Sequence, residues 1–255
     1  MNKLLPSLTV ILFLVCPLSN CKVKDADVFQ PKSENIQRYG SLIKVKKKFE
    51  ERYIILHKHT FPGVLERLKK SNITNYSIFL LDGVLFSHFE YVGTDFNKDM
   101  ELMGNEVTKD WWKLTDPMQE PFENRKEGEW WASAELLYQM NTSKTAYQKA
   151  QRLAFVGELK EGQLAALKNH LNNIENSYVQ LILSANIQNW TIYEKDGKVY
   201  FYYEYVGIDL RKDISDFEKT VGFQDFSNKI GPLFKSATSD NNQIWIYMKE
   251  VFHTD

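Results

Sequence analysis

The chain has 255 residues, enough for one large domain or two small ones, and its 33 acidic residues offset 32 basic ones. A composition of 43% hydrophobic and 25% charged residues is typical of a folded globular protein and excludes a disordered chain. The net charge of −1 excludes a global positive field that would hold nucleic acid or an anionic membrane.

The N-terminus has the pattern of an export signal. Residues 1–3 include a lysine, and residues 4–18 are almost entirely apolar. About a dozen apolar residues suit the hydrophobic region of a signal peptide, whereas a bilayer span needs about 20. We therefore expect residues 1–21 to be a signal and residues 22–36 to be a polar linker before the first domain.

The end of this signal, Leu18-Ser19-Asn20-Cys21, resembles a bacterial lipoprotein box. The resemblance implies that Cys21 carries a lipid and becomes the first mature residue. The protein would then be exported and anchored to the membrane by this lipid, in the periplasm or at the cell surface. An ordinary cleaved signal and a retained anchor are the alternatives. The other cysteine of the chain is Cys16, so no intrachain disulfide is expected in the mature protein.

An internal repeat sets the architecture. Residues 75–99 and 189–213 align at a constant offset of 114, with 11 identities in 25 positions. Self-similarity of this kind predicts homologous structural units in tandem. We expect two such domains, at 37–140 and at 150–255.

Both repeats have the same predicted elements. The first should contain a strand (38–45), a helix (47–69), a hairpin (74–81 and 84–92), a second helix (95–115) and a last strand (131–139). The second should contain them at 152–159, 161–183, 188–195 with 198–206, 210–233 and 243–253. Asp82-Gly83 and Asp196-Gly197 suit two-residue type I′ turns, because Asp-Gly tolerates positive φ at both positions. The order β-α-β-β-α-β is the ferredoxin-like unit.

Neither face of the first predicted hairpin is polar enough to meet water. The face that carries Tyr76 and Phe89 and the opposite face, with Phe79 and His88, are both mainly apolar. Two helices can cover one face, so the other must meet a second sheet. The predicted fold class is therefore α+β, with two tandem ferredoxin-like repeats packed as a pseudo-dimeric α+β barrel. Such an intrachain pseudo-dimer can remain a monomer. His88, which faces away from Tyr76, is expected to be a core histidine.

Candidate site residues gather in the first repeat. Tyr53 and His57 are four apart on a predicted helix and therefore share a face. Tyr76 begins the second strand, and Trp111-Trp112 lies on the second helix. Aromatic rings pack on the C–H faces of sugars, phenols bond sugar hydroxyls, and a histidine moves protons near neutral pH. Together these residue types predict a pyranose site.

The same residues carry a resemblance to the L-rhamnose mutarotase family. The matching segments are Glu51-Arg-Tyr-Ile-Ile-Leu-His57, Phe61-Pro62, Asn75-Tyr76, Asp110-Trp-Trp-Lys113 and Ser133-Ala-Glu-Leu-Leu-Tyr138. They follow one another in the family's order across 37–140. The second repeat matches the family in the order of its elements. The family has Asn-Pro after the histidine, where this chain has Lys58-His59.

The resemblance implies an isomerase that needs no cofactor and interconverts the α and β anomers of L-rhamnose or a related deoxyhexose. By motif position it implies that His57, Tyr53 and Tyr76 are catalytic and that Trp111 and Trp112 bind the sugar. His57 would act as acid and base, and positioned proton transfer contributes about 10²–10⁴-fold in rate. No metal is expected. The expected partner is a monosaccharide, and no nucleic acid is expected.

The second repeat lacks this set of residues. At the offset of 114 the counterparts of Tyr53, His57, Tyr76, Trp111 and Trp112 are Leu167, Leu171, Trp190, Asp225 and Phe226. We therefore expect one active site per chain, in the first domain, and a degenerate second domain with a structural role.

Two other functions remain open from the sequence. A non-catalytic sugar-binding lipoprotein would keep the pocket without turnover. A cofactor-free monooxygenase acting on a planar substrate would also suit an α+β barrel, although no motif in the chain specifically indicates one.

Overall fold

The computed structural model describes residues 36–140, 150–237 and 243–255. The expected signal and Cys21 lie outside these residues, as does nearly all of the expected linker. Within the three described ranges, no helix has both the length and the apolar character that a membrane span requires.

The N-terminal half follows the predicted order of elements. It contains β1 (Gln37–Val45), α1 (Glu50–Lys58), α2 (Pro62–Lys70), β2 (Ile73–Leu81), β3 (Val84–Tyr91), α3 (Phe96–Glu101), α4 (Glu106–Thr115), β4 (Gln119–Glu120), β5 (Ala132–Ser133) and β6 (Glu135–Gln139). Short 3₁₀ turns lie at Lys47–Phe49 and Asp116–Met118.

The C-terminal half repeats this order. It contains β7 (Gln151–Glu158), α5 (Leu164–Asn172), α6 (Asn176–Ser184), β8 (Ile187–Lys195), β9 (Lys198–Tyr205), α7 (Leu210–Glu218), α8 (Val221–Ile230), a 3₁₀ turn at Gly231–Leu233 and β10 (Ile246–Thr254).

Each long helix expected from the sequence is in fact two short ones, so that part of the prediction was wrong. The first breaks before Pro62, which stands at the first position of α2, where its missing N–H leaves no helical bond unmade. The second breaks before α4, whose N-cap residue Asn105 accepts a hydrogen bond from the backbone N–H of Thr108. These local stop signals outweigh the continuous apolar pattern of the sequence.

Both hairpins turn at the predicted Asp-Gly pairs. Asp82 and Gly83 have φ of 47° and 77°, and Asp196 and Gly197 have φ of 55° and 76°. Positive φ at both central positions identifies a type I′ turn, which matches the twist of the flanking strands. The turns therefore determine the register of β2 with β3 and of β8 with β9.

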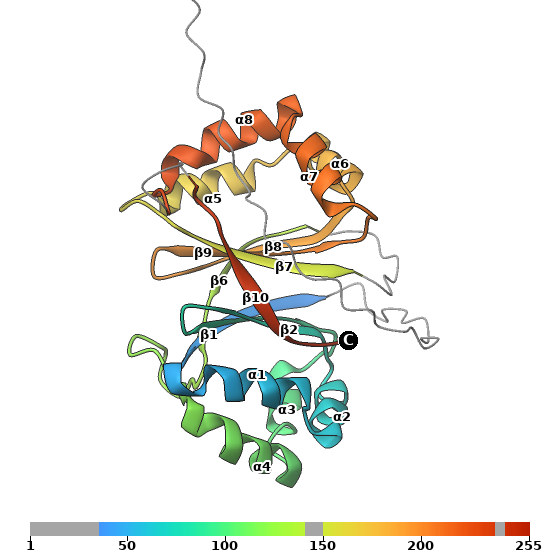
Figure 1. Cartoon of the computed structure of the whole chain (residues 1–255), viewed down its shortest axis with the longest axis vertical. Helices are drawn as coiled ribbons and strands as arrows, with labels where there is room; N and C mark the ends of the chain where they lie inside the picture. The colour runs from blue at the N-terminus through green and yellow to red at the C-terminus, as the bar shows by residue number, and fades with distance from the viewer. Residues whose placement is uncertain (1–35, 141–149, 238–242) are drawn as a thin grey trace, which may run out of the picture.

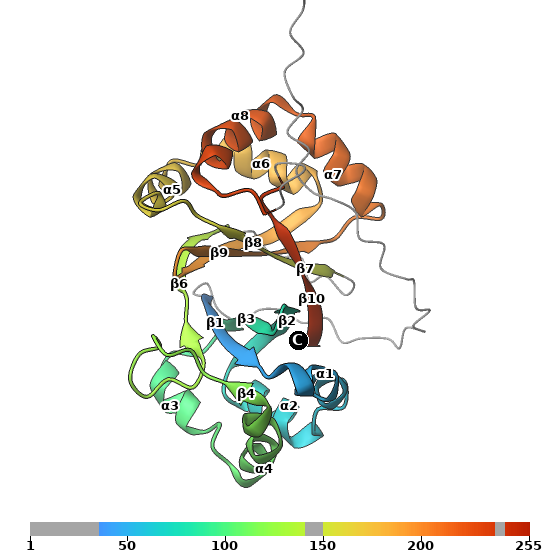
Figure 2. The same cartoon turned by 60° about the vertical axis from the view of Figure 1, so that its left-hand side comes forward.

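The last strand of each repeat leaves its own half and joins the sheet of the other. In β10, residues 246–248 pair with β7, while residues 249–254 pair with β2 of the N-terminal half. In the same way, β5 pairs with β1, and β6 continues to β8 of the C-terminal half. Figures 1 and 2 show β10 running from one sheet to the other. The two repeats are therefore joined by backbone hydrogen bonds at both edges, as a pseudo-dimeric barrel requires.

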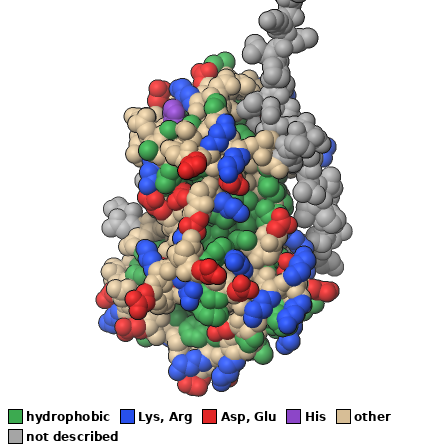
Figure 3. Space-filling view, turned by 90° about the vertical axis from the view of Figure 1, so that its left-hand side faces the viewer, with side chains coloured by type: hydrophobic (Ala, Val, Ile, Leu, Met, Phe, Trp, Pro, Cys, Tyr) green, Lys and Arg blue, Asp and Glu red, His purple; other side chains and the backbone are tan. Residues whose placement is uncertain are grey.

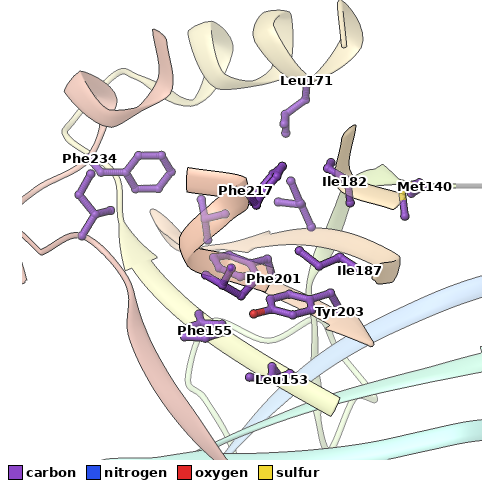
Figure 4. Packing of buried hydrophobic residues seen from close by; sticks show 14 of the residues in the cluster. Met140, Leu153, Phe155, Leu171, Ile182, Ile187, Phe201, Tyr203, Phe217 and Phe234 are labelled. Carbon is purple, nitrogen blue, oxygen red and sulfur yellow. The ribbon is translucent and has the colours of Figure 1, made fainter. Parts of the chain in front are cut away.

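The halves stack as four layers, with helices outside and the two sheets back to back (Figure 1). One cluster, which includes Ile78 and Leu85, fills the space between α1–α4 and their sheet. The corresponding C-terminal cluster is drawn in Figure 4. A third, which includes Phe79 and Tyr202, lies between the sheets. The prediction that helices cover one hairpin face and a second sheet covers the other is therefore confirmed.

Polar side chains near the pseudo-twofold axis also bridge the halves. Asn75 donates to Glu204 Oε1 across 2.7 Å, and Asn189 donates to Glu90 Oε1 across 3.0 Å. The buried ring of His88 bonds Tyr193 OH from the other repeat at 2.9 Å, as a core histidine would. Because buried polar groups need partners, this network favours one registration of the two repeats.

The surface carries charges of both signs. On the face shown in Figure 3, Lys and Arg side chains are interspersed with Asp and Glu, around a hydrophobic area in the middle of the molecule. This mixture agrees with the balanced composition.

Candidate active site

A cavity of about 440 Å³ opens in the N-terminal half, between its helices and its sheet. It brings together all five site residues expected from the sequence. Its lining comprises Tyr53, His57, Thr60, Val64, Leu68, Tyr76, Ile78, Met103, Thr108, Trp111, Trp112, Thr115, Asp116, Gln119, Trp130, Trp131 and Phe252.

Helix α1 places Tyr53 and His57 one turn apart on its buried face. The phenol and imidazole rings stack with their centroids 3.9 Å apart, and the side chains are 0% and 8% exposed. His57 Nδ1 lies 3.0 Å from the backbone carbonyl oxygen of Tyr53. Because a carbonyl can only accept, Nδ1 carries the proton and the neutral ring keeps its lone pair on Nε2. Within the described residues Nε2 has no protein partner, so it is available to a ligand in the cavity.

Aromatic neighbours determine the charge of His57. The edges of Trp111 and Phe252 approach its ring, with centroids 5.1 and 5.7 Å away. Burial among them disfavours the imidazolium and lowers the pKa of His57 to about 4, although the backbone carbonyl of Tyr53 opposes the shift. At neutral pH the ring is therefore uncharged and can act as a proton acceptor.

Tyr76 lies in a β-bulge and lines the cavity. The register between β2 and β3 shifts between Thr74 and Ser77, and Asn75 adopts a φ of 49°. Asn75 and Tyr76 then oppose one residue, Phe89, on the partner strand. The Tyr76 ring packs edge-on against Phe89 and Phe252, at centroid distances of 5.7 and 5.5 Å. Tyr76 packs in the same cluster as Ile78, so the predicted alternation of faces holds through the bulge.

Both cavity phenols remain protonated. Burial raises the pKa of Tyr53 well above its usual value, and the nearby Tyr76 adds to the shift. Burial also raises the pKa of Tyr76. A neutral phenol donates a hydrogen bond, so the site offers two donors beside one basic nitrogen.

The two tryptophans on α4 differ in their exposure to solvent. Trp111 is 6% exposed and packs edge-on against His57 and Phe61. Trp112, which also lines the cavity, is 39% exposed. The two rings therefore provide one buried apolar surface and one accessible to solvent.

Several lining residues were missed in the sequence. Gln119 contacts Tyr53 OH through Nε2 at 3.5 Å and accepts from Trp130 Nε1 at 2.8 Å. Asp116 stands at the end of α4, and burial raises the pKa of its carboxyl. A second tryptophan pair, Trp130-Trp131, directly precedes β5. This pair is the feature of the sequence that could have indicated further cavity residues. Nothing local marks Gln119, since its role depends on the pairing of β4 with β1.

Phe252 comes from the other repeat. It reaches the N-terminal cavity because β10 pairs with β2. Its counterpart at the offset of 114, Tyr138, packs in the C-terminal half against Trp190 at 5.3 Å. The C-terminal half thus contributes a side chain to the candidate site.

No three or more His, Cys, Asp or Glu side chains in the described ranges are arranged to hold a metal ion. The polar groups of the cavity are hydroxyls, an imidazole, an amide and a carboxylate, which suit hydrogen bonds to a polyhydroxylated ligand.

The equivalence of the tryptophan pair with the second repeat has to be corrected. Helices α4 and α8 both contain ten residues but begin 115 positions apart, as do their N-caps Asn105 and Thr220. One extra residue before α8 causes this shift. Trp111 therefore corresponds to Phe226 and Trp112 to Ser227, and the equivalences with Asp225 and Phe226 expected from the sequence were wrong. The counterparts of Tyr53 and His57 remain leucines, because α1 and α5 keep the offset of 114.

Comparison with known proteins identifies both halves. A family model described as L-rhamnose mutarotase matches residues 38–140 and again residues 152–254. An L-rhamnose mutarotase from Lactiplantibacillus plantarum is 33% identical over 89 residues, covering 34% of this chain and 84% of the relative. One from Flavobacterium johnsoniae is also 33% identical over 89 residues, covering 34% of this chain and 81% of the relative.

Solved structures share the whole fold. A candidate monooxygenase from Lactobacillus acidophilus superposes with a TM-score of 0.54 over 85% of this chain and 95% of its own, at 6% identity. Another, from Fusobacterium nucleatum, gives a TM-score of 0.50 over 86% and 94%, at 10% identity. Likeness at this level of identity shows the α+β barrel alone and carries no information on activity.

Proposed function

We propose a function from one premise: the chain belongs to the L-rhamnose mutarotase family, which matches it twice. The proposed activity is interconversion of the α and β anomers of L-rhamnose or a related deoxyhexose in the N-terminal cavity. The observation that carries the proposal is a neutral His57 with an unpartnered Nε2, held in an aromatic cavity beside two protonated phenols.

In the proposed mechanism His57 moves one proton. Nε2 accepts the proton of the anomeric hydroxyl while the bond between the anomeric carbon and the ring oxygen breaks. The imidazolium then returns this proton to the ring oxygen, which gives the open aldehyde. Rotation of the aldehyde and reversal of the steps closes the ring on the other face. Atoms and electrons balance without a co-reactant, because the reaction only relocates one proton and one C–O bond.

The phenols and the aromatic walls would support this step. As donors, Tyr53 and Tyr76 stabilise negative charge that develops on the sugar oxygens. Trp111 and Trp112 offer ring faces for the C–H surface of a pyranose, while Gln119 offers an amide for its hydroxyls.

A specific observation favours a second candidate, non-catalytic sugar binding. General acid–base catalysis is most effective when the pKa of the group lies near the working pH, and the pKa of His57 is about 4. A protein that binds the sugar but turns it over slowly would have the same cavity.

One experiment separates the two candidates. Anomer exchange of L-rhamnose is measured by exchange NMR with wild type, His57→Ala and the matched control Leu171→Ala, the same position in the second repeat. Mutarotation predicts faster exchange with wild type and with Leu171→Ala, and a loss of about 10²-fold or more with His57→Ala. Sugar binding without faster exchange supports the second candidate. If the protein shows neither sugar binding nor faster exchange, both candidates are refuted. The same assay with L-fucose, galactose and uronic acids would define the substrate.

Export and lipid attachment at Cys21 are part of the proposal and rest on the sequence pattern. Growth with a labelled fatty acid should label the wild-type protein but not Cys21→Ser. Equal labelling of both proteins, or of neither, would refute lipid attachment at this residue.

A further inference from the structure

The C-terminal half contains a second cavity at the position equivalent to the candidate active site. Its volume is about 110 Å³, and its walls come from α5, α6, α8 and the faces of β8 and β9. Figure 4 shows part of this region, with Leu171 pointing from its helix toward the side chains of the sheet. The two cavities are related by the internal repeat, but they have opposite chemistry.

Nearly every polar group of the first cavity has an apolar counterpart in the second. At the offset of 114, Tyr53 and His57 correspond to Leu167 and Leu171. Helix α4 and the residues up to Gln119 follow the offset of 115. There Thr108 corresponds to Phe223, Thr115 to Ile230, Asp116 to Gly231 and Gln119 to Phe234. All of these counterparts line the second cavity. There are two exceptions: Tyr76, whose counterpart Trp190 keeps an indole N–H, and Trp112, whose counterpart is Ser227.

Most of the polar lining has thus been lost, and the cavity is reduced from about 440 Å³ to about 110 Å³ without being closed. Leucines at two positions replace a phenol and an imidazole, and part of the space remains open. Protein interiors are packed closely, with few voids larger than a water molecule, so an open cavity of this size is unusual. A cavity lined by Leu, Ile and Phe stays dry and accepts apolar guests. About 150 Å³ holds benzene, so a cavity of about 110 Å³ suits a slimmer guest, such as a short alkyl chain.

A sugar does not suit this cavity. Its hydroxyls would leave water without gaining partners from leucine, isoleucine or phenylalanine side chains, which costs free energy for every hydroxyl. A short alkyl chain loses no hydrogen bonds and gains contacts with the apolar walls.

We propose that this C-terminal cavity binds a short alkyl chain, at a site separate from the sugar site. Tyr178 and Phe226, whose rings stack at 4.6 Å, line both the cavity and a neighbouring polar groove. The groove also contains Asn169, His170, Glu175 and Lys229. A polar substituent on the ligand would lie in this groove, on the other side of the two stacked rings.

The experiment titrates the full chain with n-butane and follows side-chain NMR signals. Butane should shift the methyl resonances of Leu171 and Ile182 and leave those of Val64 and Leu68, in the other cavity, unchanged. Unmoved resonances of Leu171 and Ile182 at butane saturation would overturn the proposal, as would equal shifts in both cavities.

Two variants test the location. Leu171→Phe, which fills the cavity, should weaken butane binding at least tenfold, and His57→Ala should leave it unchanged. Undiminished butane binding by a folded Leu171→Phe would also overturn the proposal, and if this variant does not fold, the wild-type methyl shifts decide alone. Anomer exchange plays no part in this readout, so its outcome is independent of the proposed isomerase activity.

Discussion

Acidification should destabilise the fold through His57, by an amount that follows from its burial. The pKa of this residue is about 4 in the folded chain and 6.5 when unperturbed. The unfolded state therefore binds more protons between these values, and stability is fully present above about pH 6.5 and is lost as the pH falls toward 4. From pH 7.5 to 5 the loss assigned to His57 is about 2 kcal/mol of unfolding free energy.

Urea unfolding at pH 7.5 and pH 5 measures this loss. The free energy of unfolding is compared for wild type and His57→Phe, which keeps an aromatic ring but cannot titrate. The variant should lose about 2 kcal/mol less than wild type over this pH interval, because contributions from other groups such as His88 and His253 cancel in the comparison. His59→Phe is the matched control, since His59 is exposed two residues away on the same segment.

The reasoning is refuted if wild type and His57→Phe lose the same free energy between the two pH values. It is also refuted if the His57 ring titrates near pH 6.5 in a direct NMR measurement, because the burial argument would then be wrong. A loss of pH dependence in His59→Phe would point to a different histidine.

Three further outcomes follow from the site and the fold. The rate of anomer exchange in the NMR assay should stay constant from pH 8 to about 5 and fall tenfold per pH unit below about 4, because His57 becomes protonated. A decline that starts near pH 6.5 would contradict this. Gln119→Leu should weaken sugar binding about tenfold in a calorimetric titration, because it removes the amide that orients a phenol and an indole of the cavity, and unchanged affinity would exclude this role. Gly40→Ala should cost about 1–3 kcal/mol in urea unfolding, since its Cβ would lie 2.7 Å from the ring of Tyr193 in the opposite repeat, whereas wild-type stability would show that the sheets can separate.

The repeat and its hairpins were predictable because their causes are local. Asp82-Gly83 and Asp196-Gly197 determine a turn through their own backbone preferences, and the turn determines the strand register. Tyr53 and His57 share a helix face at a spacing of four wherever that helix packs. The resemblance of these motifs to the L-rhamnose mutarotases supplied the family, which both halves match.

The helix breaks and the counterpart of Trp111 were less predictable. Residues 59–61 and Asn105 interrupt segments whose apolar pattern continues through them, so periodicity alone predicts longer helices. A single extra residue before α8 then moves the equivalences by one position from α8 to Phe234, whereas β10 returns to the offset of 114. An alignment of the two repeats at one constant offset cannot reveal this shift, whereas the positions of the N-cap residues of α4 and α8 do.

The features that could be predicted from the sequence alone depend on residues close together in the chain. They are the two repeats, their hairpin turns, and the shared helix face of Tyr53 and His57. Tertiary structure decided what depends on distant segments. Phe252 enters the site because β10 crosses to the other sheet, and Gln119 reaches Tyr53 because β4 pairs with β1. The low pKa of His57 likewise arises from side chains far away in sequence that exclude water from its ring. Strand pairing and burial are properties of the assembled chain, and the charge and surroundings of the candidate catalytic group follow from them.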